Sequence, residues 1–225
     1  MKKAIVLLSG GLDSATTLYL AQQKGFQCRC LIFDYGQQHK REIESAKKIA
    51  QSLRSPYQVI KIELPWKGSA LLDNKINIPK RKNTGTQEHK DEIPSTYVPA
   101  RNIIFLSFAL SYAEAAKAEA IFVGANAIDF SGYPDCRPQF YRAFKKIIAA
   151  GTKAGVEKKK IKILTPLLRK TKAEIVLTGK KLGVPFALTW SCYRGGKRPC
   201  GECDSCYFRA KGFREAKIID PLINK

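Results

Sequence analysis

The sequence has no apolar segment near the length of about 20 residues that a membrane-spanning helix needs. Its apolar start, residues 4–8, gives way to Ser9, Gly10 and Gly11 and is too short for the core of a secretion signal. Internal repeats and low-complexity tracts are also lacking. We therefore expect a globular, cytoplasmic protein in a reducing compartment, where cysteines are not paired as disulfides by default.

Acidic residues are few, since 19 Asp and Glu accompany 40 Lys and Arg and give a formal net charge of +21. Such an excess raises RNA or another polyanion as a partner. The lysines are spread along the whole chain, however, and no basic run is interleaved with aromatic residues as a base-stacking platform would be. We favour a basic surface that serves solubility and anionic small substrates, with no direct nucleic-acid contact required.

Short apolar runs alternate with helical patterns along most of the chain. The strand patterns cover residues 3–8, 28–33, 57–64, 120–124 and 161–164, and after the first helical pattern the later ones cover 42–53, 102–117, 139–154 and 172–182. This alternation predicts an α/β fold with a doubly wound, mostly parallel sheet and right-handed crossovers. Ligands of such sheets gather at the carboxyl ends of the strands.

Two further signals concern the ends and gaps of these elements. Thr171 and Glu174 have capping-box spacing at the start of the last helical pattern, and Gly183 follows its end. Residues 65–100 show no periodicity, and a stretch of that length in a compact domain is usually a functional lid or a mobile insertion. We expect a lid-like insertion there.

A glycine-rich segment, Ser9 to Ser14, stands where the first strand pattern turns into the first helical pattern. Its glycines let the backbone approach an anion, its serine hydroxyls can donate to phosphate oxygens, and the helix start offers free N–H groups. It lacks the Gly-Lys-Ser/Thr of a Walker loop and the third glycine of a dinucleotide fingerprint. The segment predicts a phosphate cradle of another kind, with a plain tight turn as the alternative.

Four of the seven cysteines fall close together with the spacing C-x7-C-x2-C-x2-C: Cys192, Cys200, Cys203 and Cys206. Four thiolates without an open position predict one structural zinc ion per chain, with an iron–sulfur cluster as the alternative. The segment has too few apolar residues for a core of its own, so we expect a zinc-binding module, residues 187–225, after a nucleotide-binding domain, residues 1–186. The net negative charge of such a site could be offset by nearby cations: Arg194, Lys197, Arg198 and Arg209.

The glycine-rich segment resembles the SGGxDS signature of PP-loop ATP pyrophosphatases, which split ATP between its α and β phosphates. The resemblance implies that Ser9, Gly10, Gly11 and Ser14 hold the pyrophosphate portion, and that Asp13 places magnesium or orients the loop. It implies a larger set of ATP contacts as well: Leu8, Ser9, Gly10, Gly11, Leu12, Asp13, Ser14, Ala15, Thr16, Thr17, Leu18, Tyr35 and His39.

Four further segments narrow the resemblance: residues 35–39 (YGQQH), 97–102 (YVPARN), 129–137 (DFSGYPDCR) and 189–193 (TWSCY). Together they resemble the 7-cyano-7-deazaguanine synthase family, from residue 4 to about 216. The resemblance implies a zinc-containing, homodimeric ligase of queuosine biosynthesis. It would turn 7-carboxy-7-deazaguanine and ammonia into the nitrile with ATP and magnesium. Two residues depart from the family pattern, Gln38 in place of arginine and Ala100 in place of glycine, so no ionic role is carried over to position 38.

The resemblance also gives roles to individual side chains. A guanine-like edge presents N1–H and an amino group, which Asp129 or Asp135 could accept. Phe130 or Tyr133 could stack on the ring. The substrate carboxylate or the ATP phosphates could be held by an arginine, Arg101 or Arg137. The expected catalytic set is Ser9, Asp13, Ser14 and Arg101. Taken without the resemblance, residues 131–135 are an ordinary turn.

Two histidines occur in the chain. His39 follows the second strand pattern and suits nucleotide contact or acid–base work, whereas His89, in the segment without periodicity, is expected to face solvent.

Two other functions remain open at this point. A PP-loop enzyme that modifies tRNA directly would also have a zinc module and a basic surface, although such enzymes usually carry an added RNA-binding domain. A non-catalytic zinc-ribbon protein that binds nucleic acid is the second alternative, and it leaves the segment after the fourth strand pattern unexplained.

Overall fold

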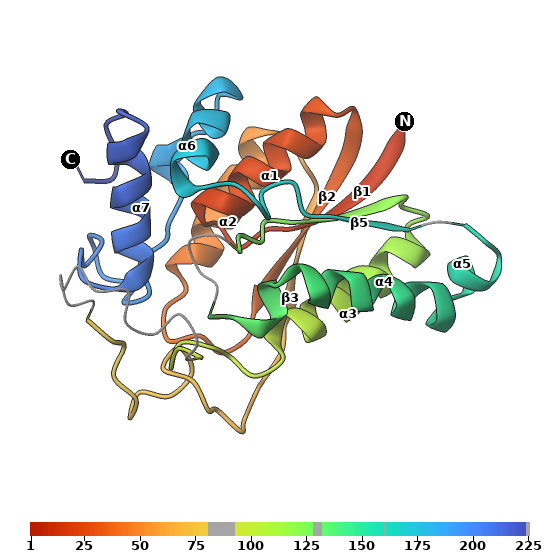
Figure 1. The fold of residues 1–225 in the computed structure, drawn as a ribbon, viewed down its shortest axis with the longest axis horizontal. Coiled ribbons are helices and arrows are strands. Elements are labelled where there is room, and N and C mark those ends of the chain that lie inside the picture. Colours follow the sequence, from red (N-terminus) through yellow and green to blue (C-terminus); the bar gives the residue numbers. More distant parts are fainter. Residues whose placement is uncertain (81–92, 128–131, 160, 224–225) are drawn as a thin grey trace.

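A computed structural model of the chain describes residues 1–80, 93–127, 132–159 and 161–223 (Figure 1). Five parallel strands form one sheet in the order β3-β2-β1-β4-β5. Their bounds are β1 Lys2–Leu7, β2 Phe26–Asp34, β3 Tyr57–Lys61, β4 Ala120–Val123 and β5 Lys162–Leu164. The strand order changes direction between β1 and β4, and this makes their carboxyl ends the switch point of a doubly wound sheet. The expected fold class is confirmed.

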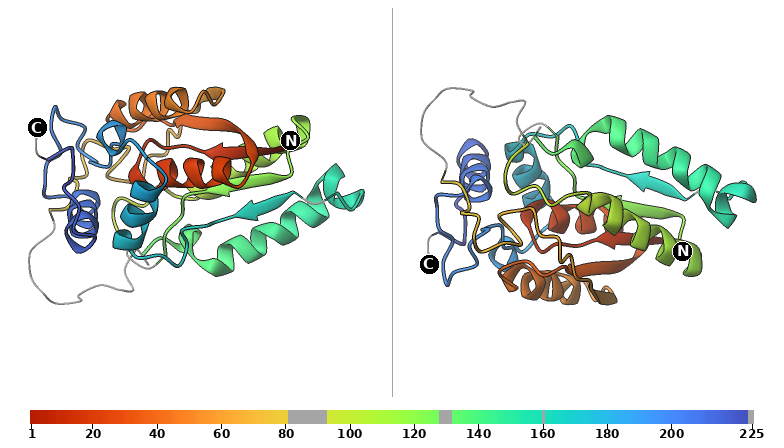
Figure 2. Two further views of the ribbon diagram at one scale, coloured as in Figure 1. Left: turned by 90° about the horizontal axis from the view of Figure 1, so that it is seen from above. Right: turned by 90° about the horizontal axis from the view of Figure 1, so that it is seen from below.

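Helices cover both faces of the sheet (Figures 1 and 2). The described helices are α1 Leu12–Gln23, α2 Arg41–Ser52, α3 Arg101–Ala115, α4 Pro138–Gly151, α5 Lys153–Val156, α6 Lys172–Lys181 and α7 Asp204–Glu215, with short 3-10 turns at Pro134–Cys136 and Phe186–Leu188. Helices α1, α2 and α6 lie on one face, and α3 and α4 on the other. None of the described helices has both the length and the apolar character needed to cross a membrane.

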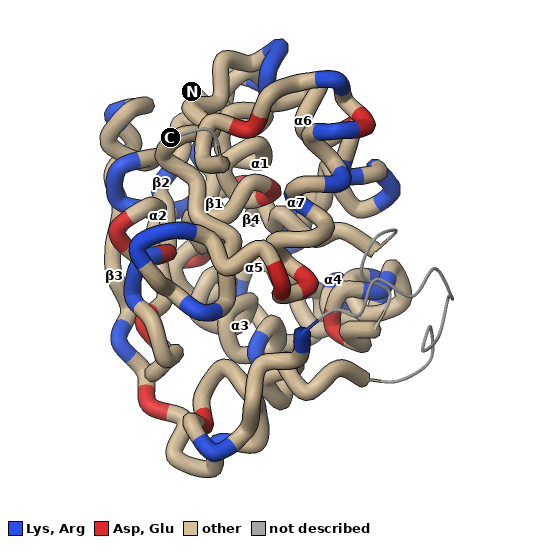
Figure 3. The backbone as a smooth tube through the Cα atoms, turned by 90° about the vertical axis from the view of Figure 1, so that its left-hand side faces the viewer, with Lys and Arg blue, Asp and Glu red and all other residues tan. Residues whose placement is uncertain are grey.

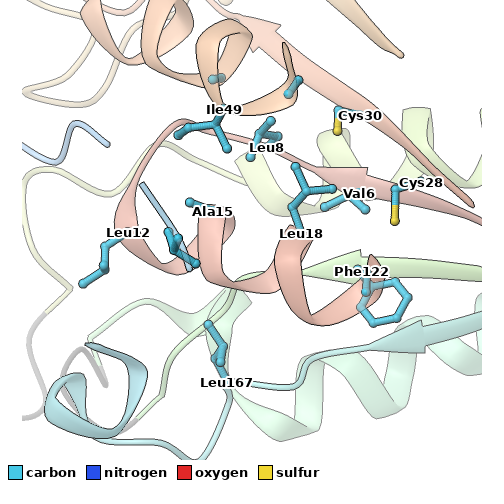
Figure 4. Packing of buried hydrophobic residues seen from close by; sticks show 14 of the residues in the cluster. Val6, Leu8, Leu12, Ala15, Leu18, Cys28, Cys30, Ile49, Phe122 and Leu167 are labelled. Carbon is cyan, nitrogen blue, oxygen red and sulfur yellow. The ribbon is translucent and has the colours of Figure 1, made fainter. Parts of the chain in front are cut away.

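Alternate residues of the central strands feed two separate cores. Val6 and Cys30 pack under α1 and α2, whereas Ile5 and Leu31 pack under α3, because successive side chains of a strand point to opposite faces. Figure 4 shows part of the first core, in which Leu18 of α1 lies beside Val6 of β1. Both sheet faces are buried, which explains why the strands appear in the sequence as continuous apolar runs.

The ends of the later helices follow local hydrogen bonds. The capping box at α6 is confirmed, since the Thr171 hydroxyl and the Glu174 carboxylate each bond the other's backbone N–H. The single helix expected over 139–154 is wrong, because the chain becomes extended at Thr152 (φ −129°, ψ 153°). The Thr152 hydroxyl accepts the Gly155 N–H at 2.9 Å and starts the separate helix α5.

The segment without periodicity has no helix or strand in its described parts, residues 65–80 and 93–100. Its two arms meet where the Ala70 N–H donates to the Ser95 carbonyl at 2.8 Å. Leu71 and Val98 are buried in the core beneath α3. The flanks of this segment are therefore anchored to the fold, whereas a lid function for it stays a prediction. His89 lies outside the described residues.

The C-terminal segment joins the main core through α7. Phe213 of α7 packs edge-to-face against Phe186 with ring centroids 5.2 Å apart, and it belongs to the same core cluster as α1. A small separate cluster contains Trp190 with three of the cysteines. The division at residues 186 and 187 stays a prediction. In the view of Figure 3, lysine and arginine are scattered over many elements of the described chain and do not form one stripe.

Candidate active site and metal site

A cavity of about 300 Å³ opens at the carboxyl ends of β1, β2 and β4. Its wall contains the loop after β1, the ends of β2 and β4, the first turns of α2 and α3, and parts of the C-terminal segment. The expected site residues that line it are Leu8, Ser9, Gly11, Leu12, Asp13, Ser14, Tyr35, Arg101 and Tyr133. Residues more than 180 positions apart in the sequence thus share one cavity.

The loop between β1 and α1 is closed by its own serines. The Ser9 N–H donates to the Ser14 hydroxyl at 3.2 Å, the two hydroxyls are 3.1 Å apart, and the Ser14 hydroxyl donates to the Gly11 carbonyl at 3.1 Å. Gly11 precedes α1 and offers no side-chain cap, so the first N–H groups of the helix are left for a ligand. A helix start of this kind favours an anion, and phosphate above all.

Glycine is required at position 10 for two reasons. Its φ of +85° is strained for any other residue, and a Cβ there would lie 2.2 Å from the Glu42 carbonyl oxygen. The loop therefore packs directly on the backbone of α2. On the other side, the Trp190 N–H donates to the Gly10 carbonyl at 2.9 Å.

Asp13, in the first turn of α1, forms an ion pair with Lys172 of α6. Both carboxylate oxygens accept from the Lys172 ammonium group, at 2.8 and 3.1 Å. Gly212 of α7 packs against the stem of that lysine, since a Cβ at Gly212 would lie 2.5 Å from Lys172 Cγ. The pair ties the start of α1 to the C-terminal helices. No sequence pattern indicated Lys172, because its partner Asp13 lies 159 positions away.

Arg101 begins α3 and lines the same cavity. Its guanidinium donates to the Tyr35 hydroxyl at 3.3 Å and lies 5.7 Å from the centre of that ring. Its pKa is raised further above its ordinary value by Tyr35 and Tyr133, although burial acts in the opposite direction. The preceding residue, Ala100, has φ +54°, a left-handed conformation. This explains why glycine suits that position.

Glu42, in the first turn of α2, also lines the cavity. Burial raises the pKa of its carboxyl group to about 7, although Arg101 and a hydrogen bond from Gln37 act in the opposite direction. That bond runs from Gln37 Nε2 to Glu42 Oε1 over 3.2 Å. Sequence reasoning missed Glu42, since its helix position is polar and unremarkable and only the fold places it beside the phosphate loop.

Of the expected deazapurine contacts, Tyr133 lines the cavity and Asp135 does not. Tyr133 is buried, lines the cavity and bonds the Thr96 hydroxyl at 2.7 Å. Asp135 is outside the cavity lining, and its Oδ2 accepts the Asn102 N–H at 3.1 Å at the start of α3. Burial raises the pKa of Asp135, whereas the Asn102 bond and Arg101 lower it. Its carboxylate thus supports the turn that carries Arg101.

The remaining expected contacts lie away from the cavity lining or outside the described residues. Arg137 is exposed just before α4. Asp129 and Phe130 fall in the range 128–131, outside the described residues. The α1 residues of the expected ATP set are buried in the body of the helix and do not line the cavity: Ala15, Thr16, Thr17 and Leu18.

His39 lies beside the cysteines and not in the cavity lining. A Cβ at Gly195 would be 2.1 Å from His39 Cβ, so the two chain segments are in direct contact. Burial lowers the pKa of this histidine, although Cys192 acts in the opposite direction. A nucleotide contact by His39 stays a prediction.

The four expected metal ligands come together, and their sulfur atoms all lie within 4.8 Å of one another: Cys192, Cys200, Cys203 and Cys206. Cys200 Sγ and Cys206 Sγ are 3.9 Å apart, and a tetrahedral zinc with Zn–S bonds of about 2.3 Å places its sulfurs about 3.8 Å apart. In a four-iron cluster each thiolate binds a different iron, and the sulfurs lie further apart. The donor set therefore fits one zinc ion.

Backbone N–H groups point at these sulfurs and favour their thiolate form. The N–H groups of Arg194 and Cys200 donate to Cys192 Sγ at 3.4 and 3.3 Å. The expected charge compensation by Arg209 is wrong, because its guanidinium is buried in a two-bond ion pair with Asp220, at 2.7 and 2.9 Å. A buried arginine needs a paired carboxylate, and Asp220 supplies it.

Comparisons with known proteins bear on the family of the chain. A 7-cyano-7-deazaguanine synthase from Nostoc punctiforme is 49% identical over 223 residues, covering 98% of this chain and 99% of that protein. One from Acetivibrio thermocellus is 51% identical over 223 residues, covering 99% and 97%. The solved structure of NMN synthetase from Francisella tularensis has a TM-score of 0.50 and 15% identity, covers 97% of this chain and 87% of that chain, and shows the fold alone.

The model of a protein family described as "Queuosine biosynthesis protein QueC" matches residues 3–217, nearly the whole described fold and both motifs. The relatives carry the name of a synthase over their full length, so the chain is an ATP-dependent synthase and not a non-catalytic zinc ribbon. Cavity, phosphate loop, cysteine site and sequence match lead to the same conclusion: the chain belongs to the QueC family of queuosine biosynthesis proteins.

Proposed function

We propose that the chain uses two ATP molecules to convert 7-carboxy-7-deazaguanine and ammonia into 7-cyano-7-deazaguanine. One observation carries the proposal: the phosphate loop opens into the same cavity as Arg101, Glu42 and Tyr133. Hydrogen-bond donors for anions, a buried cation and an aromatic ring are what a carboxylated purine analogue and ATP require. The names of relatives about half identical to this chain support the same product.

In the first step a carboxylate oxygen of the substrate attacks the α phosphorus of ATP. The open N–H groups at the start of α1 and the hydroxyls of Ser9 and Ser14 face the departing pyrophosphate and stabilise its charge. Asp13 is the residue that the family pattern assigns to magnesium, and this ion would supply further positive charge at the phosphates. Arg101 holds the substrate carboxylate or a phosphate by charge-assisted hydrogen bonds.

In the second step ammonia attacks the acyl-adenylate, and AMP leaves as the amide forms. The amide retains one oxygen too many for a nitrile. The same loop therefore adenylates the amide oxygen with a second ATP, and AMP carries that oxygen away as the C≡N bond forms. We assign Tyr133, and the expected contacts Asp129, Phe130, Asp135 and Arg137, to the deazapurine side of the site.

The cysteine site keeps a structural role in this scheme. Four thiolates fill a tetrahedral zinc and leave no open position for a substrate. The ion would hold the segment that carries Trp190, whose N–H bonds the phosphate loop at Gly10. The zinc site thus shapes one wall of the cavity and takes no part in bond making.

Oxygen-18 in the substrate carboxylate tests the chemistry directly. Purified protein with ATP, ammonium and labelled 7-carboxy-7-deazaguanine should give the nitrile free of label and two AMP molecules with one label each. The amide, offered as substrate, should react with one ATP and without ammonium. Label in inorganic phosphate, with ADP as co-product, would show acyl-phosphate chemistry and would refute the proposal.

We also propose that the enzyme acts as a homodimer in the cytoplasm, as the family resemblance implies. Light scattering coupled to size-exclusion chromatography measures the mass directly. A single species of about 25 kDa, the mass of one chain, would contradict the dimer. Fluorescent fusion protein found at the cell envelope would contradict the location.

A further inference from the structure

The nitrogen chemistry of this reaction needs a proton acceptor in the cavity. Ammonia is mostly ammonium at neutral pH, and the nitrogen ends in a nitrile without hydrogen, so four protons leave it in one turnover. Two leave as the acyl-adenylate becomes an amide, and two leave as the adenylated amide becomes a nitrile. This requirement rests on the proposed function, and a basic side chain beside the reacting nitrogen would meet it.

Most ionisable side chains in the described cavity wall are unsuited to accept these protons. The phenols and the thiol remain protonated at neutral pH, because burial raises their pKa values: Tyr35, Tyr133, Tyr193 and Cys136. The cationic side chains of the wall are hydrogen-bond donors to Tyr35, Asp13 and Asp220 and offer no acceptor: Arg101, Lys172 and Arg209. Only carboxyl groups are left.

Two carboxyl groups belong to the described lining, those of Asp13 and Glu42, and the first already forms an ion pair. Asp13 accepts from the Lys172 ammonium group with both oxygens, at 2.8 and 3.1 Å. Accepting a proton there would break an ion pair with little exposure to solvent. The carboxyl group of Glu42 has no such cation bonded to it.

The surroundings hold Glu42 in place and leave it able to react. Gln37 Oε1 accepts the Tyr35 N–H at 2.8 Å, which fixes the amide so that its Nε2 points at Glu42 Oε1, 3.2 Å away. Within the described residues, Gln37 is the one hydrogen-bond donor to this carboxyl group, and the second oxygen remains for a ligand. The backbone of Glu42 packs on Gly10 of the phosphate loop.

We propose that Glu42 is the proton acceptor for the incoming nitrogen. Its carboxylate binds ammonium, takes one proton and leaves neutral ammonia, whose lone pair attacks the acyl carbon. The new C–N bond forms, the nitrogen loses a second proton to water, and the C–O bond to AMP breaks. Glu42 then returns its proton to solvent. It accepts the N–H protons of the adenylated amide in the same way.

Arg101 and Tyr35 are the charged and titratable groups that face Glu42 from α3 and from the end of β2. Arg101 favours the carboxylate and burial opposes it, which leaves the pKa near 7. A base of this strength accepts a proton from ammonium and releases it again within a turnover, as efficient acid–base groups do.

Glu42→Gln tests the proposal, because glutamine keeps the shape and the bond from Gln37 but cannot take a proton. Wild-type protein is run first, and its failure to make nitrile would refute the proposed function and not this inference. In the variant, nitrile synthesis should fall at least about 100-fold. ATP–pyrophosphate exchange with the carboxylate substrate, run without ammonium, should stay within about threefold. Glu44→Gln is the matched control, since Glu44 is exposed on the same helix and paired with Lys47.

Two further readouts separate proton transfer from a structural role. Hydroxylamine can replace ammonia as the nucleophile and is largely unprotonated at neutral pH. The rate of hydroxamate formation should therefore fall far less in the variant than the rate of nitrile synthesis. In wild-type protein at saturating total ammonium, nitrile synthesis should fall as the pH drops below about 7, whereas exchange should not. Equal loss of exchange and synthesis in the variant, or a wild-type rate that is flat between pH 8 and pH 6, would overturn the proposal. The wild-type profile decides the matter should the variant fail to fold.

Discussion

The phosphate loop and the cysteine cluster are both short motifs, yet the chain holds them in opposite ways. The loop sits between strand β1, whose residues Ala4, Ile5 and Val6 are fully buried, and helix α1, and its serines bond one another. Three cysteines of the cluster lie among residues 189–203, which contain no strand or helix and are partly exposed, and the fourth, Cys206, lies in the first turn of α7. The first takes its shape from the fold, whereas the second depends on the ion that it binds.

Removing the ion should therefore give the largest effect. Structural zinc binds peptides with about 10–16 kcal/mol at pH 7, and this energy becomes folding energy. Cys203→Ser, at a fully buried ligand, should lose the zinc, lower the melting temperature and free the segment around Trp190. Metal analysis and calorimetry measure both, with one zinc per wild-type chain expected.

Cys28→Ser is the control, because Cys28 lies in the main core and should keep its zinc. Iron in place of zinc, or a Cys203→Ser protein that keeps its metal and its melting temperature, would break the comparison.

Ser14→Ala alters the phosphate loop but leaves in place β1 and α1, the strand and helix that hold its two ends. The Ser14 hydroxyl bonds Ser9 and the Gly11 carbonyl, so it both shapes the loop and offers a donor to phosphate. We expect ATP–pyrophosphate exchange to fall by about 100- to 1,000-fold, the usual cost of one transition-state donor, while stability changes by about 1 kcal/mol. Ser107→Ala, on an exposed turn of α3, should leave exchange unchanged. Normal exchange in Ser14→Ala would move the ATP site elsewhere.

Gly10→Ala tests whether the fold really dictates the loop. A Cβ at Gly10 meets the Glu42 carbonyl oxygen at 2.2 Å and must also adopt φ +85°. Gly25→Ala has a similar φ of +78° but meets nothing within 4 Å. The control should lose about 1–2 kcal/mol from φ alone, and Gly10→Ala should lose about 2 kcal/mol more from the clash. Urea unfolding compares them, and equal losses would mean that the loop can move away from α2.

Ala100→Gly should give the smallest effect and the opposite sign. Ala100 has φ +54°, a strain of about 1–2 kcal/mol. Glycine relieves the strain, but its larger conformational entropy in the unfolded chain lowers the stability by about 0.4–1 kcal/mol. The net expectation is a stabilisation of about 0.5–1 kcal/mol, seen as a raised urea midpoint. A destabilised variant would show that the Ala100 methyl group packs usefully beside Arg101.

What could be predicted from the sequence shares one property, namely that its cause is local. The strands appear as apolar runs because both faces of the sheet are covered. Ser9 to Ser14 and the four cysteines bring their own turns and spacing, so the loop and the metal site were found. The start of α6 was predictable for the same reason, since Thr171 and Glu174 are three residues apart.

What could not be predicted depends on contacts between distant segments. Lys172 is an ordinary helix lysine until α6 packs beside α1 and brings it to Asp13. Glu42 gains its raised pKa from burial in a cavity whose wall is assembled from strands and helices far apart in the sequence. Arg209 appeared to be a counter-charge for the cysteines because it is near them in sequence, but the fold gives it Asp220. Asp135 likewise bonds the start of α3, a partner that no spacing rule indicates.

The cavity also carries a consequence for synthesis on the ribosome. Its wall begins at Leu7 and ends at Arg209, a separation of about 200 residues that a ribosome adding about 5–20 residues per second covers in about 10–40 s. Through that interval the phosphate loop is complete, but Trp190 and the C-terminal wall have not yet emerged. The nascent chain therefore has an incomplete ATP site. We expect its nucleotide chemistry to begin only when the C-terminal segment packs against the phosphate loop.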